Sequence, residues 1–188
     1  MSVPLRQQAR VAAYIMKKRL QGQKRYPLVL MLEPLFQCNL ECPGCGKIQY
    51  PKDILKQRLS AKECVGAAEE CGAPVVSIPG GEPLIHREID QIVNELTKRK
   101  YYVYLCTNAM LLKKKLHLFE PSPYLNFSIH LDGLKDEHDR AVNQEGVFET
   151  ATEAIEEATR RGFRCTVNAT LFDDATAERV SAFLDYVS

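Results

Sequence analysis

The chain has 188 residues, 45% of them hydrophobic and 26% charged, with a formal net charge of +1. This length predicts one domain with a globular core, and the near-neutral charge argues against a nucleic-acid-binding protein. No stretch approaches the roughly 18 apolar residues of a membrane-spanning helix, and the N-terminus lacks a signal-peptide core. We therefore expect a cytoplasmic protein whose thiols stay reduced.

Residues 1–28 form the first predicted unit, a basic helical segment. They carry seven basic side chains and no acidic one, whereas residues 29–188 have a net charge of −6. Apolar residues recur in the segment at a broken helical spacing. A basic amphipathic helix can lie on an anionic membrane surface, here the inner face of the membrane. The alternative is a solvated helix that packs on the domain.

From residue 29 onward, strand and helix patterns alternate, which predicts an α/β fold with a parallel sheet. Ser60 and Glu63 make a capping box, and Gly72 and Gly162 are placed to end helices. Five units are too few for a closed eight-stranded barrel of about 250 residues, so we expect an open doubly wound sheet or part of a larger, open barrel. The predicted strands are 29–35, 74–79, 101–106, 125–131 and 165–171, and the predicted helices lie near 60–71, 86–99, 110–119, 147–161 and 175–187.

The sequence FQCNLECPGC places Cys38, Cys42 and Cys45 directly after the first predicted strand. Three thiolates at this C-x3-C-x2-C spacing can bind one soft-metal centre from a single loop. A structural zinc site needs a fourth protein ligand, and the nearest downstream candidate is Cys64. A three-thiolate iron–sulfur cluster, in contrast, leaves one iron open to an outside ligand. Metal binding is favoured over a disulfide framework.

Cysteines at this spacing, on the loop after the first strand of a βα array, resemble the radical S-adenosylmethionine (SAM) superfamily. The resemblance implies that the three cysteines hold a [4Fe–4S] cluster whose fourth iron binds SAM. It also implies a partial (βα)n open barrel in residues 29–188, with about five of the family's six units present. The sixth unit and the C-terminal region are expected to be absent. One departure is Gly44, where the family commonly has an aromatic residue.

Polar residues at the ends of the later strands supply the rest of this predicted site. GGEP follows the second strand, where paired glycines let a ligand approach the backbone closely. In the fourth strand, LNFSIHLDG, polar side chains alternate with apolar ones, which predicts a lined cavity; a solvated edge strand or satisfied core polar groups are the alternatives. The resemblance implies SAM contacts from Gly80, Gly81, Glu82, Pro83, Asn108, Ser128, His130, Asp132 and Asn168.

A second departure follows the Asp-Gly pair of this strand. His138 and Asp139 match a pair often found in related enzymes, but Val142 stands where an arginine commonly binds the SAM carboxylate. Arg140 is the nearest arginine that could substitute, but its side chain would have to reach SAM from a different direction than a side chain at position 142.

Cys106 ends the third strand, on the same face as Asn108. Buried cysteines are usually small hydrophobes, which is our interpretation of Cys64, Cys71 and Cys165. Cys106 differs because the active sites of parallel barrels lie at the C-terminal ends of strands. We predict that Cys106 is catalytic and donates a hydrogen atom to a substrate radical.

Longer segments, MLEPLFQCNLECPGCGKI, APVVSIPGGEPLIH, YLCTNA and SIHLDG, resemble the hopanoid branch of this superfamily, the adenosylhopane synthases. The resemblance implies an enzyme that cleaves SAM reductively and adds the 5′-deoxyadenosyl radical to the alkene of hopene (diploptene). Its electrons would come from a donor such as flavodoxin or ferredoxin. The alternatives are a radical SAM enzyme that abstracts hydrogen from another substrate, and a non-enzymatic zinc-binding domain.

Overall fold

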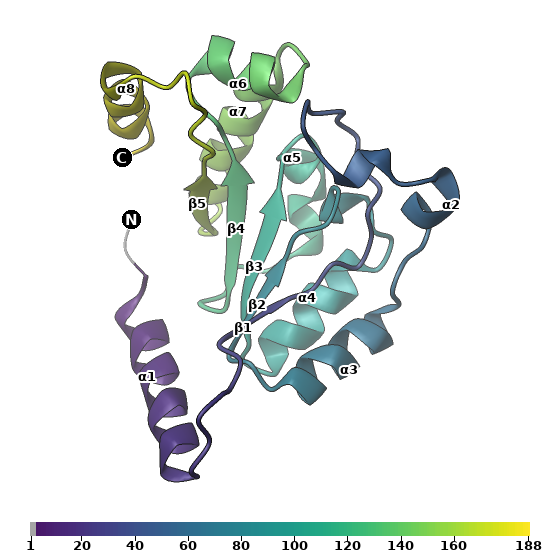
Figure 1. Ribbon diagram of the computed structural model, residues 1–188, viewed down its shortest axis with the longest axis vertical. Coiled ribbons are helices and arrows are strands. Elements are labelled where there is room, and N and C mark those ends of the chain that lie inside the picture. Colours follow the sequence, from purple (N-terminus) through teal and green to yellow (C-terminus); the bar gives the residue numbers. More distant parts are fainter. Residues whose placement is uncertain (1–2) are drawn as a thin grey trace.

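The computed structural model describes residues 3–188, apart from the side chain of Ile48. Its centre is a five-stranded sheet in the order β1-β2-β3-β4-β5, with every neighbouring pair parallel (Figure 1). The expected α/β fold with an open parallel sheet is therefore confirmed. The strands are β1 Val29–Met31, β2 Val75–Ile78, β3 Tyr102–Thr107, β4 Leu125–His130 and β5 Arg164–Asn168.

Helices connect the strands in the predicted order. The expected capping box is present, because the Ser60 side chain accepts from the backbone N–H of Glu63, and Gly72 ends the same helix in the left-handed conformation. The α-helices are α1 Leu5–Leu20, α2 Lys52–Leu55, α3 Ala61–Cys71, α4 Ile89–Lys98, α5 Leu112–Lys115, α6 Lys135–Val142, α7 Val147–Arg160 and α8 Ala177–Val187. Short 3-10 turns cover Lys47–Gln49, Pro83–Ile85 and Leu116–Leu118.

Several elements differ from the sequence prediction: the four-residue α2 was not predicted, and β5 ends at Asn168, three residues earlier than expected. β1 ends at Met31, four residues earlier than expected, because the chain then leaves the sheet toward the cysteine loop. Helix α6, of sequence KDEHDRAV, was not predicted, since its mean hydropathy is low and few of its side chains are apolar. Its buried residues are His138, Asp139 and Val142, so tertiary contacts and not an apolar stripe hold it in place.

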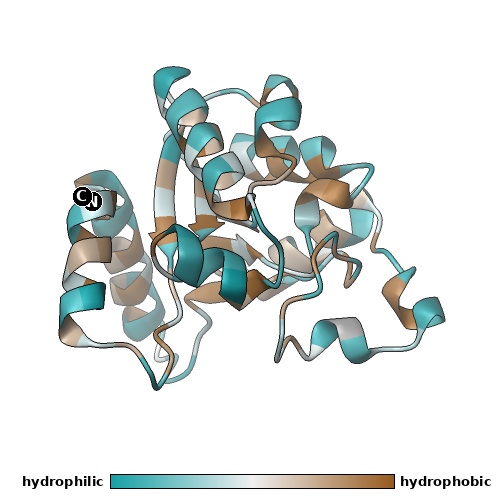
Figure 2. Ribbon diagram, turned by 90° about the horizontal axis from the view of Figure 1, so that it is seen from above, coloured by the Kyte–Doolittle hydropathy of each residue, from teal (hydrophilic) through white to brown (hydrophobic). Residues whose placement is uncertain are grey.

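The two faces of the sheet have different surroundings. One face packs with α3, α4, α5 and α7 into the main hydrophobic core, which includes Val76, Leu105 and Phe127. Figure 2 shows hydrophobic residues gathered along the strands and on the helix sides turned toward them. The opposite face carries polar, half-buried residues such as Ser77 and Ser128. Parallel sheets are usually covered on both faces, so this open polar face corresponds to the interior of an incomplete barrel.

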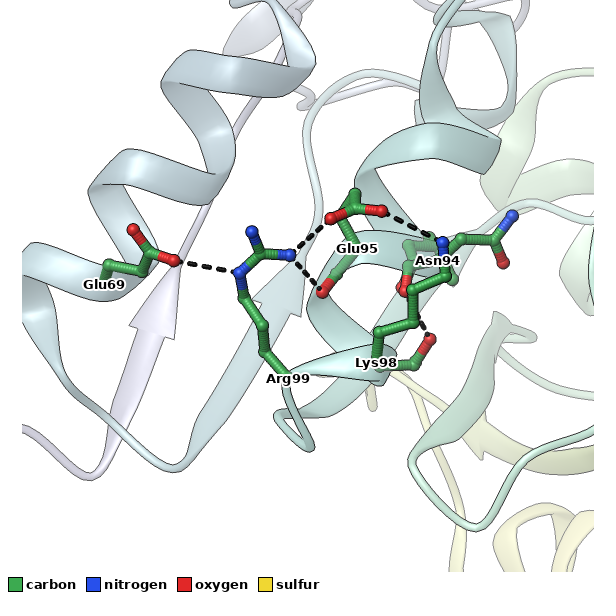
Figure 3. A network of polar contacts seen from close by, with 7 residues as sticks. Glu69, Asn94, Glu95, Lys98 and Arg99 are labelled. Carbon is green, nitrogen blue, oxygen red and sulfur yellow. Dashed lines mark hydrogen bonds and ion pairs between the residues drawn. The ribbon is translucent and has the colours of Figure 1, made fainter.

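Charged residues join α3 to α4 on the outer surface (Figure 3). Arg99 donates from Nε to Glu69 at 2.9 Å and also contacts Glu95, which accepts from Lys98 at 3.1 Å. These side chains are exposed, and exposed ion pairs each contribute only about 0–1 kcal/mol. The network links α3 to α4 with a small energetic contribution, and its residues lie outside the polar face of the sheet. In the described part of the chain, no helix has both the length and the apolar character needed to cross a bilayer.

Candidate functional site

The cysteine loop begins where the chain leaves β1, and it lies above the C-terminal ends of the strands (Figure 1). The segment just before it is fixed by the glycine turn that follows β2. Gly81 donates its backbone N–H to the carbonyl of Leu35 at 3.2 Å, and Glu82 donates to the carbonyl of Gln37 at 2.9 Å. Backbone hydrogen bonds therefore join the GGEP turn directly to the segment that leads into the three-cysteine loop.

This close approach explains why both positions of the turn are glycine. Gly80 has a φ of +134°, and a Cβ built there would lie 2.5 Å from the Leu35 carbonyl oxygen. A Cβ at Gly81 would lie 2.2 Å from the Gln37 oxygen and 2.4 Å from the Phe36 oxygen. A side chain at Gly81 would thus overlap the segment leading into Cys38. The backbone N–H groups of Gly81 and Glu82 are used in these hydrogen bonds. An ammonium group such as that of SAM is a hydrogen-bond donor, so it needs carbonyl oxygens as partners and not these N–H groups.

Glu82 is fully buried and joins the glycine turn to the end of β3. Its Oε1 accepts from the backbone N–H of Leu84 at 2.9 Å and from Thr107 Oγ1 at 2.8 Å, and its Oε2 accepts from the N–H of Asn108 at 2.9 Å. Burial raises the pKa of Glu82 to about 7, although these donors favour the charged form. The Glu82 side chain therefore holds the backbone of Asn108 in position. Pro83, the next residue in the chain, is also buried.

We predict that Glu82 makes the stability of the protein pH-dependent. A carboxyl group with a folded pKa of about 7 binds a proton that the unfolded chain has already released, so stability falls as pH rises from about 4.5 to about 7. Between pH 5 and pH 8 this group should remove about 2–3 kcal/mol of unfolding free energy. Urea unfolding of the wild type and of Glu82→Gln at pH 5 and pH 8 measures this change in unfolding free energy. The variant should lose that part of the pH dependence, and equal pH dependence in the two proteins would contradict the assignment.

Cys38, Cys42 and Cys45 are partly exposed free thiols on the same loop. Burial is the largest cause that raises the pKa of Cys42 to about 11, and the charges of Cys38 and Cys45 contribute to this rise. A raised pKa keeps this thiol protonated in the absence of metal, and binding of a metal centre would release the proton. Cys38 and Cys42 also pack against a small apolar cluster of Leu40, Val142 and Val147.

Val142, at the position where an arginine was expected, is a buried member of this cluster beneath the cysteine loop. Arg140, on the same helix, is exposed and lines a cavity of about 290 Å³ together with Pro43 and Asp132. Arg140 therefore lies near the loop, but it approaches from a different direction than residue 142 would.

Asn108 links the end of β3 to the cysteine loop. Its Nδ2 donates to Asn39 Oδ1 at 3.0 Å and lies 3.9 Å from the Cys38 sulfur, while its Oδ1 accepts from the N–H of Met110 at 3.1 Å. Asn39 was not identified from the sequence, because nothing local marks an asparagine beside a cysteine as a partner for a residue 69 positions away.

The remaining predicted residues lie along the polar face of the sheet. Cys106 is opposite Ser128 in the β3–β4 register, and His130 is opposite Asn168 in the β4–β5 register. The Cys106 sulfur lies 3.4 Å from Ser77 Oγ. The alternating pattern of β4 thus places Ser128 and His130 on the polar face of the sheet, beside Cys106 of β3 and Asn168 of β5.

Asp132 is surrounded by donors just beyond β4. His130 Nε2 lies 2.8 Å from its Oδ2, and the N–H of Thr170 donates to its Oδ1 at 2.7 Å. Burial opposes ionisation, but these hydrogen bonds prevail and lower the pKa of Asp132. The backbone N–H of Asp132 donates to Nδ1 of the buried His138 at 3.1 Å. Since burial lowers the pKa of His138, this imidazole is neutral, and its Nε2 has no partner among the described residues.

Asp139 has a structural role that its sequence match did not indicate. Its carboxylate accepts from the backbone N–H of Gly146 at 2.7 Å and of Phe148 at 2.8 Å, at the start of α7. Unpaired N–H groups at a helix N-terminus are stabilised by such an acceptor.

The chain was compared with known proteins to place this arrangement. A family model described as the radical SAM superfamily matches residues 32–187, most of the chain. The chain belongs to the radical SAM superfamily. A GTP 3′,8-cyclase of Helicobacter pylori is 24% identical over 156 residues, which are 80% of this chain and 49% of that protein. The mycofactocin maturase MftC of Mycolicibacterium smegmatis is 29% identical over 142 residues, which are 73% of this chain and 36% of that protein.

Solved structures show the same fold. SuiB of Streptococcus suis, solved with bound S-adenosylmethionine, superimposes with a TM-score of 0.71 at 22% identity, covering 93% of this chain and 39% of SuiB. The chain spans about half or less of the length of these relatives. The comparison therefore establishes a shared half-barrel and the family.

As a radical SAM protein, the chain has a [4Fe–4S] cluster and SAM as its cofactors. The residues present fit such a cluster in their chemistry, because one short loop offers three free, partly exposed thiols at the C-x3-C-x2-C spacing. The zinc alternative required Cys64, which is fully buried in the core on the covered face of the sheet. Cys64 therefore has no access to the cysteine loop while α3 stays folded. Within residues 3–188, no three His, Cys, Asp or Glu side chains are gathered as ligands for a single metal ion, so Cys38, Cys42 and Cys45 share one loop but do not form a closed ligand set in this structure.

Proposed function

We propose that this radical SAM chain binds its cluster through Cys38, Cys42 and Cys45 and adds the 5′-deoxyadenosyl group of SAM to the alkene of hopene. The observation that carries the proposal is a half-buried thiol, Cys106, on the open polar face of the sheet. Addition to an alkene leaves a carbon radical on the product, which must acquire a hydrogen atom. The resemblance of several sequence segments to adenosylhopane synthases is the reason for proposing hopene as the alkene.

The surroundings of Cys106 suit a hydrogen-atom donor. Burial raises the pKa of this thiol, so that it keeps its proton at neutral pH. Its sulfur contacts Ser77 Oγ at 3.4 Å and donates to the carbonyl oxygen of Tyr104 at 3.8 Å. A thiolate has no S–H bond to break, so a protonated thiol is the reactive form here.

The SAM-binding residues of the proposal lie on the glycine turn, at the end of β3 and along the polar face of the sheet. The carbonyl oxygens of the turn at Gly80 and Gly81 would receive the SAM amino group, while Glu82 and Pro83 fix this turn from below. Asn108 lies next to Cys38 and holds the loop through Asn39. Side chains farther along the sheet would contact the ribose and carboxylate of SAM: Ser128, His130, Asp132 and Asn168.

When bound and reduced by one electron, the cluster and SAM supply methionine and a 5′-deoxyadenosyl radical. The terminal alkene carbon of hopene forms a C–C bond with that radical, which leaves a tertiary carbon radical. Cys106 donates the hydrogen atom of its S–H bond to this carbon. A second electron and a proton then restore the thiol, from a one-electron donor of the flavodoxin or ferredoxin class. Each turnover thus consumes one SAM, two electrons and one proton.

We predict that Cys106→Ala separates SAM cleavage from product formation. Methionine should be released at the wild-type rate, while adenosylhopane forms at least about ten-fold more slowly and as a mixture of epimers at the new carbon. Mass spectrometry and NMR of the lipid product measure both effects, and Cys71→Ala, a partly exposed cysteine at the end of α3, is the matched control. A single epimer formed at full rate would remove Cys106 from the mechanism.

The same assay separates the proposal from its alternative. Anaerobic enzyme is mixed with SAM, a reductant and hopene, and the fate of the adenosyl group is followed. Adenosylated lipid supports addition to the alkene. Free 5′-deoxyadenosine without a lipid adduct would instead indicate hydrogen abstraction from a different substrate.

A further inference from the structure

Helix α1 is held on the open side of the sheet by one of its faces. Gln7 is buried on this face and donates from Nε2 to the hydroxyl of Tyr104 in β3 at 3.1 Å. Farther along the helix, the Tyr14 hydroxyl donates to the carbonyl of Pro27 at 3.0 Å. Figure 1 shows α1 on the opposite side of the strands from α3 and α4. The inward face of α1 therefore combines these polar contacts with the half-buried side chains of Val11, Tyr14 and Ile15.

The outward side of α1 also carries a line of apolar residues, which is unusual for the solvent-exposed side of a helix. Leu5 is 82% exposed, Met16 64% and Leu20 86%. Their spacing of eleven and fifteen residues from Leu5 places them on one line along the helix. Large apolar residues are seldom exposed in a row without a function. We call this line the outer stripe of α1, and it consists of Leu5, Ala9, Ala12, Ala13, Met16 and Leu20.

Basic residues flank the outer stripe. At 100° per residue, Arg6, Arg10 and Lys17 lie along one edge and Arg19 along the other, and all four are exposed. Lys24 and Arg25 follow in the exposed turn, and residues 1–28 contain no acidic side chain. The combination of an apolar line with cationic edges is complementary to a surface that has an anionic layer above an apolar interior.

We infer that α1 docks the protein on an anionic lipid membrane, with the outer stripe inserted among the acyl chains and the basic edges at the headgroups. The positive charge favours a lipid surface over a second copy of the chain. Two α1 helices that met through this face would bring their basic edges together, and residues 1–28 offer no acidic side chains to pair with them. This inference goes beyond the proposed reaction and does not depend on the substrate.

The docking helix is also close to the reactive face of the sheet. Tyr104, which binds Gln7, lies two residues before Cys106 on the same strand and the same face. Successive residues on one face of a strand are about 7 Å apart. A lipid taken up beside α1 would therefore enter the open face near the thiol.

Vesicle flotation with the cluster-loaded chain tests the inference, using lipid without hopene. Wild type should float at least about ten-fold more with phosphatidylcholine vesicles containing about one-third phosphatidylglycerol than with phosphatidylcholine alone, and added salt should weaken binding. Met16→Asp/Leu20→Asp should reduce flotation about ten-fold. Gln57→Asp/Gln91→Asp, two exposed sites outside α1, adds the same charge and should bind like wild type.

Three results would overturn the inference: no flotation of wild type, full flotation of the Met16→Asp/Leu20→Asp variant, or a dimer in light scattering that this variant splits. Iron content and SAM cleavage are measured in parallel, because exposed substitutions in α1 should leave both unchanged. Failed docking with intact SAM cleavage therefore rejects the membrane surface without affecting the proposed reaction.

Discussion

Replacing Cys42 with alanine is expected to abolish cluster binding and SAM cleavage together. Cys42 is the central member of the three-cysteine loop, and burial together with the charges of Cys38 and Cys45 raises its pKa. Two remaining thiolates cannot hold a cubane cluster whose fourth iron must stay open for SAM. We expect about four irons and four sulfides per wild-type chain after anaerobic reconstitution, and a loss of at least about 100-fold in methionine release for the variant.

The control for this experiment is another cysteine of the same chain. Cys71 is also partly exposed but lies at the end of α3. Cys71→Ala should retain wild-type iron content and SAM cleavage. If Cys42→Ala kept full iron content and cleaved SAM, the three-cysteine assignment would be wrong. Stoichiometric zinc without iron in the wild type would contradict it equally.

Gly81→Ala should damage the cluster site without changing any ligand. The added methyl group would lie 2.2 Å from the Gln37 carbonyl oxygen and 2.4 Å from that of Phe36, and both are backbone atoms that cannot rotate away. The turn and the cysteine-bearing segment must therefore separate, breaking the hydrogen bonds to Leu35 and Gln37. We expect a loss of about 3 kcal/mol in unfolding free energy, measured by urea denaturation, and a cluster content below about half of wild type.

Gly66→Ala is the matched control for this substitution. Gly66 lies within α3, and a Cβ there would meet nothing within 4 Å. Because alanine is the better helix former, this variant should be as stable as wild type or more so by about 0.5–1 kcal/mol. Equal stability and equal iron content in Gly81→Ala and wild type would show that the two segments do not need the observed close contact.

Local patterns in the sequence were sufficient for the order of the elements. Alternating strands and helices, the capping box at Ser60 and the C-terminal Gly72 all depend on residues within a few positions of each other. The spacing of Cys38, Cys42 and Cys45 is equally local, since the three proposed ligands lie within eight residues. The exceptions were the four-residue α2 and also α6, whose polar sequence has too few apolar residues for a periodic signal.

What only the tertiary structure decided are the contacts between segments far apart in the chain. The sequence did not indicate that the glycine turn is pressed against Leu35 and Gln37, or that Glu82 turns inward to hold Asn108. Nor did the periodicity of residues 1–28 determine which side of α1 faces solvent. A helix with Gln7 buried and Leu20 exposed contradicts simple hydropathy. Contacts with distant residues accompany this orientation, such as the hydrogen bonds from Gln7 to Tyr104 and from Arg6 to Tyr124. Hydrogen bonds between distant segments depend on how the sheet brings them together, and no local pattern of residues encodes that.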